Sequence, residues 1–262
     1  MITSRSNEKI RRIRELRTKK KARDEQGLFV AEGERICREI PVDRWEACFV
    51  SASFAEAHPA LSEAWRAEVL SDDLFRYACD TVNPQGILCL VKKRESSYIE
   101  IEARMREDRP VILLERLQDP GNLGTILRAG EGAGIAGVIA DAGTADLWNP
   151  KTIRSTMGSV FRVPFLTCGS LTEVIPRLRS AGAEIFAASP AAGRMYDECS
   201  FLGPCAFLIG NEGNGLSNEI SALATQTLTI PMEGEVESLN ASLAASLLMY
   251  EAARQRRNVT KR

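Results

Sequence analysis

Histidine is nearly absent from this sequence of 262 residues, because His58 is the only one. Serine–histidine–aspartate triads, H-E-x-x-H zinc sites and two-histidine metal centres would each need histidine elsewhere in the chain, so the sequence excludes them. His58 stands before a proline in a predicted loop, where an exposed side chain without a chemical role is expected. Any chemistry must therefore use carboxylate, amide, hydroxyl or guanidinium groups.

Several other features are missing. The seven cysteines are scattered and include no C-x-x-C pair, so we expect no disulfide framework, no metal and a reducing cytoplasm. No apolar run approaches the roughly 18 residues of a membrane-spanning helix, and the basic N-terminus lacks the apolar stretch of a signal peptide. We therefore expect a soluble protein that does not bind membranes. A P-loop motif is also absent, so nucleotide hydrolysis through such a loop is not supported.

The net charge of -1 hides a strong asymmetry along the chain. Residues 1–23 contain ten Lys or Arg and two Glu, a net charge of +8, so the remainder carries -9. A solvated amphipathic helix would explain part of this pattern, but the excess is larger than solubility requires. We predict phosphate binding by this segment, with Lys19, Lys20, Lys21 and Arg23 as the RNA-binding candidates.

The hydrophobic pattern predicts two domains joined by a charged linker at residues 96–109. Residues 1–95 alternate short helices and strands as a small α/β domain. Residues 110–262 show longer alternations of helices with fully apolar strands, which indicate a parallel sheet covered by helices on both faces. Ligands of such sheets bind at the carboxyl ends of the strands.

The stretch GAGIAG at residues 132–137 matches the dinucleotide pattern G-x-G-x-x-G, but its context is reversed. In the binding motif the glycines follow a strand and open a helix, whereas here they end a predicted helix and lead into a strand. Helix capping and a tight turn explain them better. A nicotinamide-dependent oxidoreductase, one alternative function, would rest on this misplaced motif alone.

Three other segments each follow a predicted parallel strand and therefore meet at one edge of the sheet. They are DPGNLGTILRAGE (119–131), GNEGNGLS (210–217) and IPMEGEVESLNAS (230–242). Their glycines allow bare backbone to approach a flat ligand. The polar side chains expected to meet there are Asn122, Arg128, Glu212, Ser238 and Asn240. This set suits an adenosyl ligand with a nucleic acid beside it.

The last predicted helix, residues 239–258, is rich in small side chains. Ser238 is its predicted N-cap, because a serine hydroxyl accepts a hydrogen bond from a free amide of the first turn. Alanines recur behind it at helical spacing, which predicts close packing against another backbone.

The three strand-end segments resemble, in order and spacing, the three motifs of SpoU-type RNA ribose 2′-O-methyltransferases, the TrmH-like branch of the SPOUT class. The stretch NEKIRRIRELRTKKKARDEQGLFVAEGERICREI at residues 7–40 also resembles the L30e-like substrate-binding domain of many of these enzymes. The resemblance covers nearly the whole chain. It implies a deep trefoil knot in the C-terminal domain, S-adenosylmethionine as cofactor, and homodimers whose sites use both subunits.

The resemblance also assigns roles to residues of this chain. Gly210, Ile230 and Leu239 correspond to positions that contact the cofactor. The catalytic and substrate-facing set corresponds to Asn122, Arg128, Glu212, Ser238 and Asn240. The L30e-like domain favours ribosomal RNA of the 23S type over transfer RNA. A non-catalytic RNA-binding or ribosome-assembly protein of the same fold is the alternative, and the intact catalytic set argues against it.

Two mechanisms of methyl transfer assign different roles to Arg128. The methyl group on a sulfonium is already activated, so the protein must align the reactants and provide a path for the ribose proton. The family's proposed base is the arginine at this position, yet a free guanidinium releases its proton only above about pH 12. Holding the target phosphate, while water or a neighbouring phosphate takes the proton, is physically easier. The sequence leaves both roles open.

Overall fold

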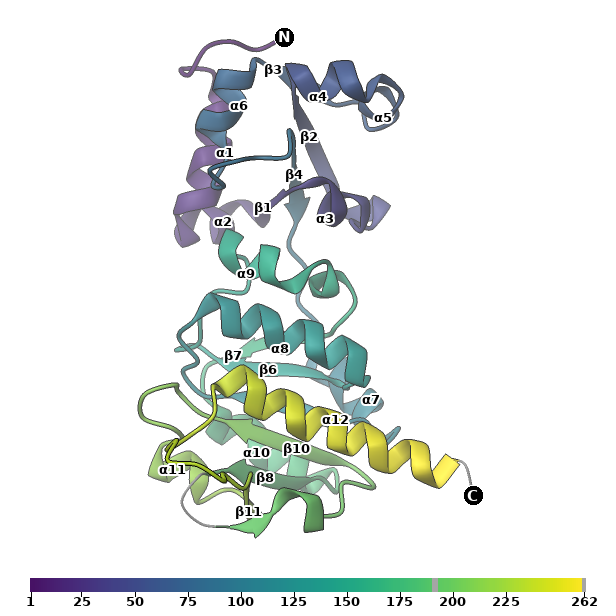
Figure 1. Cartoon of the computed structure of the whole chain (residues 1–262), viewed down its shortest axis with the longest axis vertical. Coiled ribbons are helices and arrows are strands. Elements are labelled where there is room, and N and C mark those ends of the chain that lie inside the picture. Colours follow the sequence, from purple (N-terminus) through teal and green to yellow (C-terminus); the bar gives the residue numbers. More distant parts are fainter. Residues whose placement is uncertain (190–192, 261–262) are drawn as a thin grey trace. The chain divides into compact units, whose positions relative to one another are not determined.

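The computed structural model describes residues 1–189 and 193–260 and divides the chain into two compact units (Figure 1). The N-terminal unit consists of Met1–Arg94 and Asp146–Phe161, and the C-terminal unit of Glu95–Ala145 and Arg162–Arg262. Among the described residues, none of the helices has both the length and the apolar character that crossing a membrane requires.

This division differs from the predicted one in two places. The predicted linker, residues 96–109, contains helix α7 (Tyr98–Met105), and its Ile101 and Met105 are fully buried in the core of the C-terminal unit. These two residues are four apart and so share one helix face, a narrow apolar stripe that the surrounding charges obscure. The segment Asp146–Phe161, expected in the C-terminal domain, groups with the N-terminal unit instead.

The N-terminal unit is built on a four-stranded sheet with the order β1-β4-β2-β3. Only the pairing of β2 with β3 is parallel. The strands are β1 (Leu28–Glu32), β2 (Trp45–Ser51), β3 (Glu68–Leu70) and β4 (Ile87–Lys92). The helices are α1 (Glu8–Thr18), α2 (Lys20–Gln26), α3 (Glu34–Arg38), α4 (Ala52–Ala57), α5 (Pro59–Ala64), α6 (Asp72–Ala78) and α9 (Pro150–Thr156).

The basic N-terminal segment forms two helices, because Lys19 has an extended backbone that separates α1 from α2. Ile10, Ile13 and Leu16 of α1 are fully buried, so the apolar stripe of this helix faces the core. The segment Asp146–Phe161, which contains α9 and which we call the α9 segment, packs in the same unit through aromatic contacts. The ring centroids of Phe29 and Trp148 are 4.8 Å apart.

The C-terminal unit contains a seven-stranded sheet with the order β7-β6-β5-β10-β8-β11-β9, and all of its pairings are parallel. Its strands are β5 (Val111–Leu114), β6 (Gly137–Asp141), β7 (Phe165–Cys168), β8 (Glu184–Ala188), β9 (Arg194–Met195), β10 (Cys205–Ile209) and β11 (Gln226–Thr229). Its helices besides α7 are α8 (Pro120–Ala133), α10 (Leu171–Ser180), α11 (Asn218–Ser221) and α12 (Ala241–Thr260).

Helices cover both faces of this sheet. Helices α8 and α12 lie side by side over one face, whereas α7, α10 and α11 share a core with the other (Figure 1). The predicted parallel sheet covered on both faces is therefore confirmed, and the trefoil knot stays a prediction. Ala245, Leu248 and Ala252 of α12 are fully buried, as the small-residue stripe predicts.

The glycines of GAGIAG end a helix, as their context predicts. Helix α8 ends at Ala133, and Gly134 follows in the left-handed conformation with φ of 71°. Strand β6 begins at Gly137. The motif therefore caps a helix and opens a strand, the reverse of a dinucleotide site.

Candidate cofactor and catalytic site

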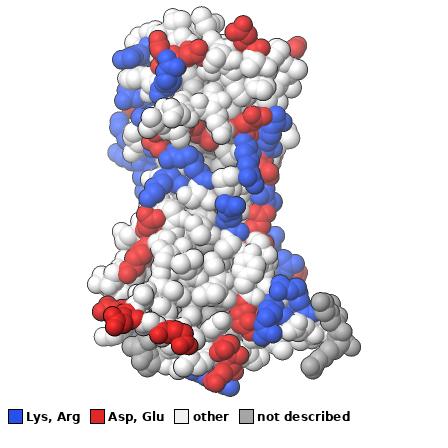
Figure 2. All heavy atoms as spheres, viewed as in Figure 1, with Lys and Arg blue, Asp and Glu red and all other residues white. Residues whose placement is uncertain are grey.

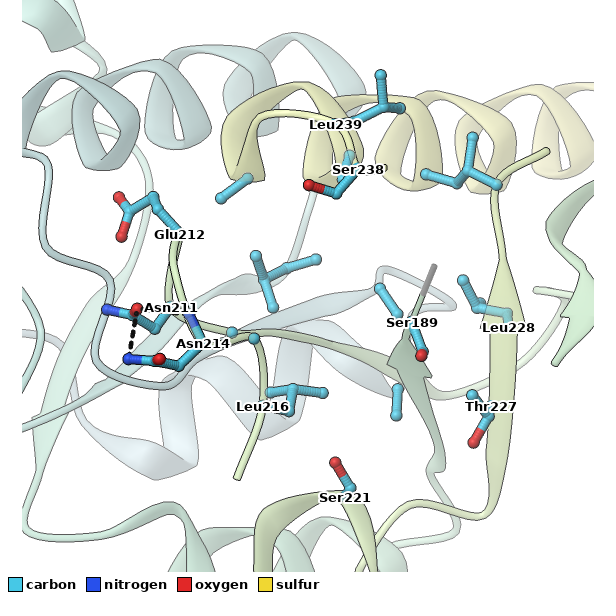
Figure 3. A pocket seen from close by; sticks show the side chains of 18 of the residues that line it. Ser189, Asn211, Glu212, Asn214, Leu216, Ser221, Thr227, Leu228, Ser238 and Leu239 are labelled. Atoms are coloured by element: carbon cyan, nitrogen blue, oxygen red, sulfur yellow. Dashed lines mark hydrogen bonds between the residues drawn. The ribbon is translucent and has the colours of Figure 1, made fainter. Parts of the chain in front are cut away.

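A cavity of about 870 Å³ lies at the carboxyl ends of β8, β10 and β11 (Figure 3). It is lined by residues from these strand ends, from the loop after β10 and from the segment that leads into α12. The three predicted cofactor-binding residues, Gly210, Ile230 and Leu239, all line it. Ser238 and Glu212 of the predicted catalytic set also line it. The cavity is thus at the edge where ligands of parallel sheets bind.

The loop after β10 closes tightly on itself and needs glycine at position 210. A Cβ on Gly210 would lie 2.2 Å from the carbonyl carbon of Gly215, closer than real atoms approach. Asn211 and Gly215 exchange two backbone hydrogen bonds of 3.0 and 2.9 Å. The Asn211 side-chain oxygen accepts from the backbone amides of Gly213 and Asn214. Gly210 is therefore required by the turn itself, before any binding of a ligand is considered.

Helix α8 brings Asn122 to this edge of the sheet. The dipeptide Asp119–Pro120 is a strong helix start, because aspartate is a preferred N-cap and proline suits the first helical position. Asp119 Oδ1 accepts a 2.9 Å hydrogen bond from the backbone amide of Asn122. Asn122 is therefore fixed in the first turn of the helix, with its side-chain amide free to contact other segments.

Glu212 binds this first turn through three hydrogen bonds. Its carboxylate accepts from the backbone amides of Gln118 at 2.9 Å and Asp119 at 3.0 Å, and from Asn122 Nδ2 at 3.0 Å. Desolvation by itself would raise the pKa of Glu212, but these three hydrogen bonds outweigh it and hold the pKa below its ordinary value. Glu212 is therefore a charged acceptor that joins the loop after β10 to the start of α8.

Asn240 joins the third segment to the same point. Its Nδ2 donates to Asn122 Oδ1 at 3.0 Å. The Ser242 hydroxyl lies 3.2 Å from Asn122 Oδ1 and 2.6 Å from Asn240 Oδ1. Asn122, Glu212 and Asn240 thus form one hydrogen-bonded junction between three segments far apart in sequence, which we call the strand-end junction.

The predicted N-cap of the last helix needs correction. Helix α12 begins at Ala241, and Asn240 caps it by accepting from the backbone amides of Ser242 at 2.9 Å and Leu243 at 3.4 Å. Ser238 lies before the cap in the exposed segment that leads into the helix. Serine and asparagine are nearly equal in capping preference, so the order S-L-N does not decide between them.

Arg128 and Ser238 are not part of the strand-end junction. Arg128 is exposed on α8 and makes no hydrogen bond or ion pair with any residue that the structure describes. Glu131, its candidate partner by helical spacing, instead binds Arg162, whose Nη2 lies 3.2 Å from Glu131 Oε2. Ser238 is exposed at the edge of the cavity (Figure 3). Both side chains are therefore available to a ligand.

Sequence reasoning missed several residues that support the site, and Glu115 is the clearest of them. It is 4% exposed and accepts from the backbone amide of Ser217 at 2.7 Å and from Arg116 Nη2 at 2.9 Å. Burial tends to raise its pKa, but the hydrogen bonds from Ser217 and Arg116 lower it overall. The sequence contained one signal for Glu115, its position directly after the apolar strand β5. A charged residue at that position lies at the edge of the sheet where ligands bind.

The predicted RNA-binding lysines lie on the surface, but each differs in its surroundings. Lys19, Lys20 and Lys21 are all exposed. Lys19 pairs with Glu15 at 3.1 Å and Lys21 with Glu25 at 3.7 Å, in each case four residues away in sequence. Such exposed pairs contribute little stability, about 0.3–0.5 kcal/mol each, but the carboxylate beside each ammonium offsets part of its charge.

The prediction that Arg23 contacts RNA is wrong, because its side chain is buried. Its side chain is 3% exposed, and its Nε and Nη2 donate to Asp146 Oδ2 at 3.0 and 2.6 Å. Its Nη1 also donates to the carbonyl of Leu16 at 2.7 Å. Arg23 is therefore a buried structural cation that fastens the α9 segment to α2, and it is not accessible to RNA.

Within residues 1–189 and 193–260, no three or more His, Cys, Asp or Glu side chains come together in a way that could hold a metal ion.

Comparison with known proteins identifies the family. Residues 109–250 match the model of the SpoU rRNA Methylase family, and residues 7–89 match that of the MRM3-like substrate binding domain. The 23S rRNA (guanosine(2553)-2′-O)-methyltransferase RlmP of Bacillus subtilis is 30% identical over 250 residues, which are 95% of this chain and 97% of the relative.

Solved structures agree with this result. The SpoU methyltransferase AviRb from Streptomyces viridochromogenes, in complex with the cofactor AdoMet, aligns with a TM-score of 0.85 and 29% identity over 95% of this chain and 98% of that one. An AdoMet-bound rRNA methyltransferase from Sinorhizobium meliloti aligns with a TM-score of 0.83 and 31% identity over 97% of both chains. The resemblance seen in the sequence is confirmed, and the chain belongs to the SpoU rRNA methylase family.

Proposed function

We propose that this protein transfers the methyl group of S-adenosylmethionine to a ribose 2′-hydroxyl of ribosomal RNA. The observation that carries the proposal is the strand-end junction, in which Asn122, Glu212 and Asn240 hold the three family motifs together beside the cavity. Relatives named for 23S rRNA methylation favour ribosomal over transfer RNA. Such a substrate also suits the predicted cytoplasmic location.

The cavity fits the proposed cofactor. Ala187, Ala188, Ala241 and Ala244 are among its lining residues, together with several glycines, so bare backbone and small side chains form much of its wall. An adenosyl group is flat and carries polar edges that backbone amides and carbonyls can recognise. Gly210, Ile230 and Leu239 would hold the cofactor, largely through their backbone.

S-adenosylmethionine supplies, when bound, a methyl group on a positively charged sulfur that needs no further activation. The chain must then align the ribose oxygen with that methyl and remove the hydroxyl proton as the new C–O bond forms and the C–S bond breaks. Alignment in a fixed site is worth an effective molarity of about 10⁵ M or more. The strand-end junction provides that rigidity, because Glu212 and Asn240 both restrain Asn122.

We assign Arg128 the role of binding the RNA substrate. It is exposed and unpaired among the described residues, so its guanidinium is free to bind an RNA phosphate in bidentate geometry. In this role water or a neighbouring phosphate accepts the proton. The alternative, in which Arg128 itself accepts the proton, requires a neutral guanidinium. Ser238, exposed at the cavity edge, is a second candidate for contact with the RNA.

We also propose that the N-terminal unit binds the RNA, with Lys19, Lys20 and Lys21 as phosphate contacts. All three are exposed, and the segment before Asp24 carries a net charge of +8. Blue side chains gather along the α1 side of this unit (Figure 2). Lysine is a mobile point charge, so these contacts would add affinity without selecting sequence.

A homodimer is the proposed assembly, and the outer face of α12 supports it. Leu243, Leu247 and Tyr250 are 55%, 40% and 48% exposed, and their spacing places them on one side of the helix. An apolar stripe of this kind marks a protein interface when it is rimmed by polar residues. Sedimentation of the wild type and of Leu247→Glu would test this, because a charge at the interface should shift the protein toward monomer.

Two measurements test the proposed function. Calorimetry should detect S-adenosylmethionine binding and no NADH binding; the reverse result would exclude a methyltransferase. Mapping of 2′-O-methyl groups in rRNA and tRNA from cells with and without the protein should reveal one rRNA position that depends on it. A site in tRNA would correct the substrate, and no dependent site in either would favour the non-catalytic alternative.

A further inference from the structure

Most of the cations in the first 23 residues have a carboxylate partner, but a few do not. Those within 4.0 Å of an Asp or Glu are Lys9, Arg12, Arg17, Lys19, Lys21 and Arg23. Among the residues that the structure describes, Arg5, Arg11, Arg14 and Lys20 have no carboxylate partner. The uncompensated positive charge of the segment is therefore concentrated mainly in three arginines.

Two of these arginines lie against one aromatic ring. The guanidinium carbons of Arg5 and Arg14 are 4.4 and 4.2 Å from the ring centroid of Tyr77 on α6, and α6 packs beside α1 (Figure 1). Arg14 Nη1 also donates to the Tyr77 hydroxyl. Arg11 lies three residues before Arg14 on α1, so it is on the same side of the helix.

The stack is not needed to hold the N-terminus in place. Ile2 is already paired with the end of β3, because its amide donates to the Val69 carbonyl at 2.8 Å and its carbonyl accepts from Ser71 at 3.0 Å. Two guanidinium groups beside one ring also repel each other, and no carboxylate offsets this among the described residues. The arrangement therefore retains binding capacity that folding does not use.

A second cation–aromatic pair in the same unit shows the contrast. Arg38 lies over Trp65 at 5.8 Å, but its Nη2 binds Glu34 at 2.5 Å, so its charge is neutralised within the protein. Arg5 is exposed and has no such partner in the part of the chain that the structure describes. Of the two, only the Tyr77 stack offers both an aromatic plane and free positive charge.

We infer that Arg5, Arg11, Arg14 and Tyr77 form a contact surface for single-stranded RNA, which we call the arginine surface. An unpaired base stacks on the layered side chains of Arg5, Arg14 and Tyr77. The phosphates beside that base bind the arginines of this surface, which have no carboxylate partner among the described residues. Unstacked bases are recognised in this way by aromatic rings and guanidinium planes, whereas paired bases are not accessible to them. The inference rests on the proposed function, since it takes RNA as the substrate.

The experiment compares Arg5→Ala with Arg5→Lys in the full-length protein. The probe is a single-stranded RNA oligonucleotide carrying a fluorescent purine whose emission falls on stacking, with the matching duplex as reference. We expect Arg5→Ala to weaken single-strand binding about tenfold, as loss of one stacked base does, and to leave duplex binding nearly unchanged. Arg5→Lys keeps the charge but loses the plane. It should retain the salt dependence of binding and lose the fluorescence change.

Three controls separate this result from other causes. Arg38→Gln removes a cation that is already paired, so it should bind the single strand like the wild type. Tyr77→Phe keeps the ring and should keep the stacking signal even though it loses the hydroxyl. Thermal unfolding should show that each variant is folded.

Equal single-strand binding by Arg5→Ala and the wild type would overturn the arginine surface, and so would a full stacking signal in Arg5→Lys. Calorimetry with S-adenosylmethionine and methyl transfer to rRNA by the wild type are measured in parallel. If both succeed while Arg5→Ala binds normally, the arginine surface fails and the proposed function stands. If the wild type shows neither, the proposed function itself fails.

Discussion

The strand-end junction and the basic helices show opposite ways of preparing a protein for a ligand. In the junction, the side chains of Asn122, Glu212 and Asn240 bind one another, so the site is ordered before any ligand arrives. In the N-terminal segment, Arg5, Arg11 and Arg14 have no carboxylate partner among the described residues, so their charge is left for a ligand to neutralise. Order suits a step that needs alignment, and free charge suits the capture of a polyanion.

Substitution of Arg128 tests this comparison most directly, and we expect it to cause the largest loss of methyl transfer. It lies near the ordered site in sequence but, among the described residues, is unpaired like the free arginines of the N-terminal segment. Arg128→Ala should lower turnover by about 10²–10⁴-fold, the range for loss of a group that assists proton transfer or positions the reacting phosphate. Single-turnover methylation measures this, with calorimetry to show that cofactor binding is retained. Normal single-turnover rates would remove Arg128 from the mechanism.

Arg128→Lys then separates the two roles of this residue. Lysine keeps the positive charge, loses the planar fork and releases its proton more readily than arginine. A base role predicts a partly active variant whose rate rises toward alkaline pH. A bidentate phosphate clamp predicts a variant nearly as poor as Arg128→Ala at every pH. The rate as a function of pH decides between them.

Substitution of Gly210 tests whether cofactor binding depends on the closed backbone conformation of the loop after β10. Gly210→Val should lower S-adenosylmethionine affinity by more than about 100-fold, because the new Cβ would lie 2.2 Å from the Gly215 carbonyl carbon and force the loop open. Gly234→Ala is the matched control, since a Cβ there meets nothing within 4 Å. Calorimetry that shows equal affinities for the two variants would contradict the role of the closed loop.

Glu212 should give a smaller effect with a distinctive pH dependence. Because its pKa is lowered in the folded protein, the carboxylate stabilises the junction above the ordinary value of 4.5 and loses that effect as the pH falls through its lowered pKa. Glu212→Gln should reduce turnover about tenfold, since one of the three donors would face an amide NH₂. The variant should also lose this acid transition in unfolding experiments. A variant that keeps the wild-type transition would assign it to another group.

We expect the smallest effect, a change in the salt dependence of RNA binding, when Lys19, Lys20 and Lys21 are replaced. This experiment compares lysines that have a carboxylate partner with one that has none among the described residues. Removal of one phosphate interaction with a single strand lowers the slope of log affinity against log salt by about 0.7. For the triple variant Lys19→Ala, Lys20→Ala, Lys21→Ala we expect a change nearer to one such interaction than to three, because Lys19 and Lys21 have glutamate partners. Salt titrations of RNA binding measure it, with cofactor affinity as the control. An unchanged slope would place the phosphate-binding residues elsewhere.

The sequence predicted much of the C-terminal unit because the signals there are local. Fully apolar strands alternate with amphipathic helices, so a parallel sheet follows, and its ligand edge follows from strand direction. The segments that contain Asn122, Glu212 and Asn240 each follow a parallel strand, and their meeting was therefore predictable. The order and spacing of the three motifs also identified the family.

Tertiary structure alone decided which polar groups pair across long distances. Arg23 was indistinguishable from its basic neighbours until the fold brought it to Asp146, which buries it and removes it from the RNA-binding candidates. Residues 146–161 also group with the N-terminal unit, whereas the hydrophobic pattern predicted them in the C-terminal domain. Composition fixes how much charge a segment carries. Which charges are neutralised, and which stay free for RNA, depends on carboxylates that only the folded chain brings within reach.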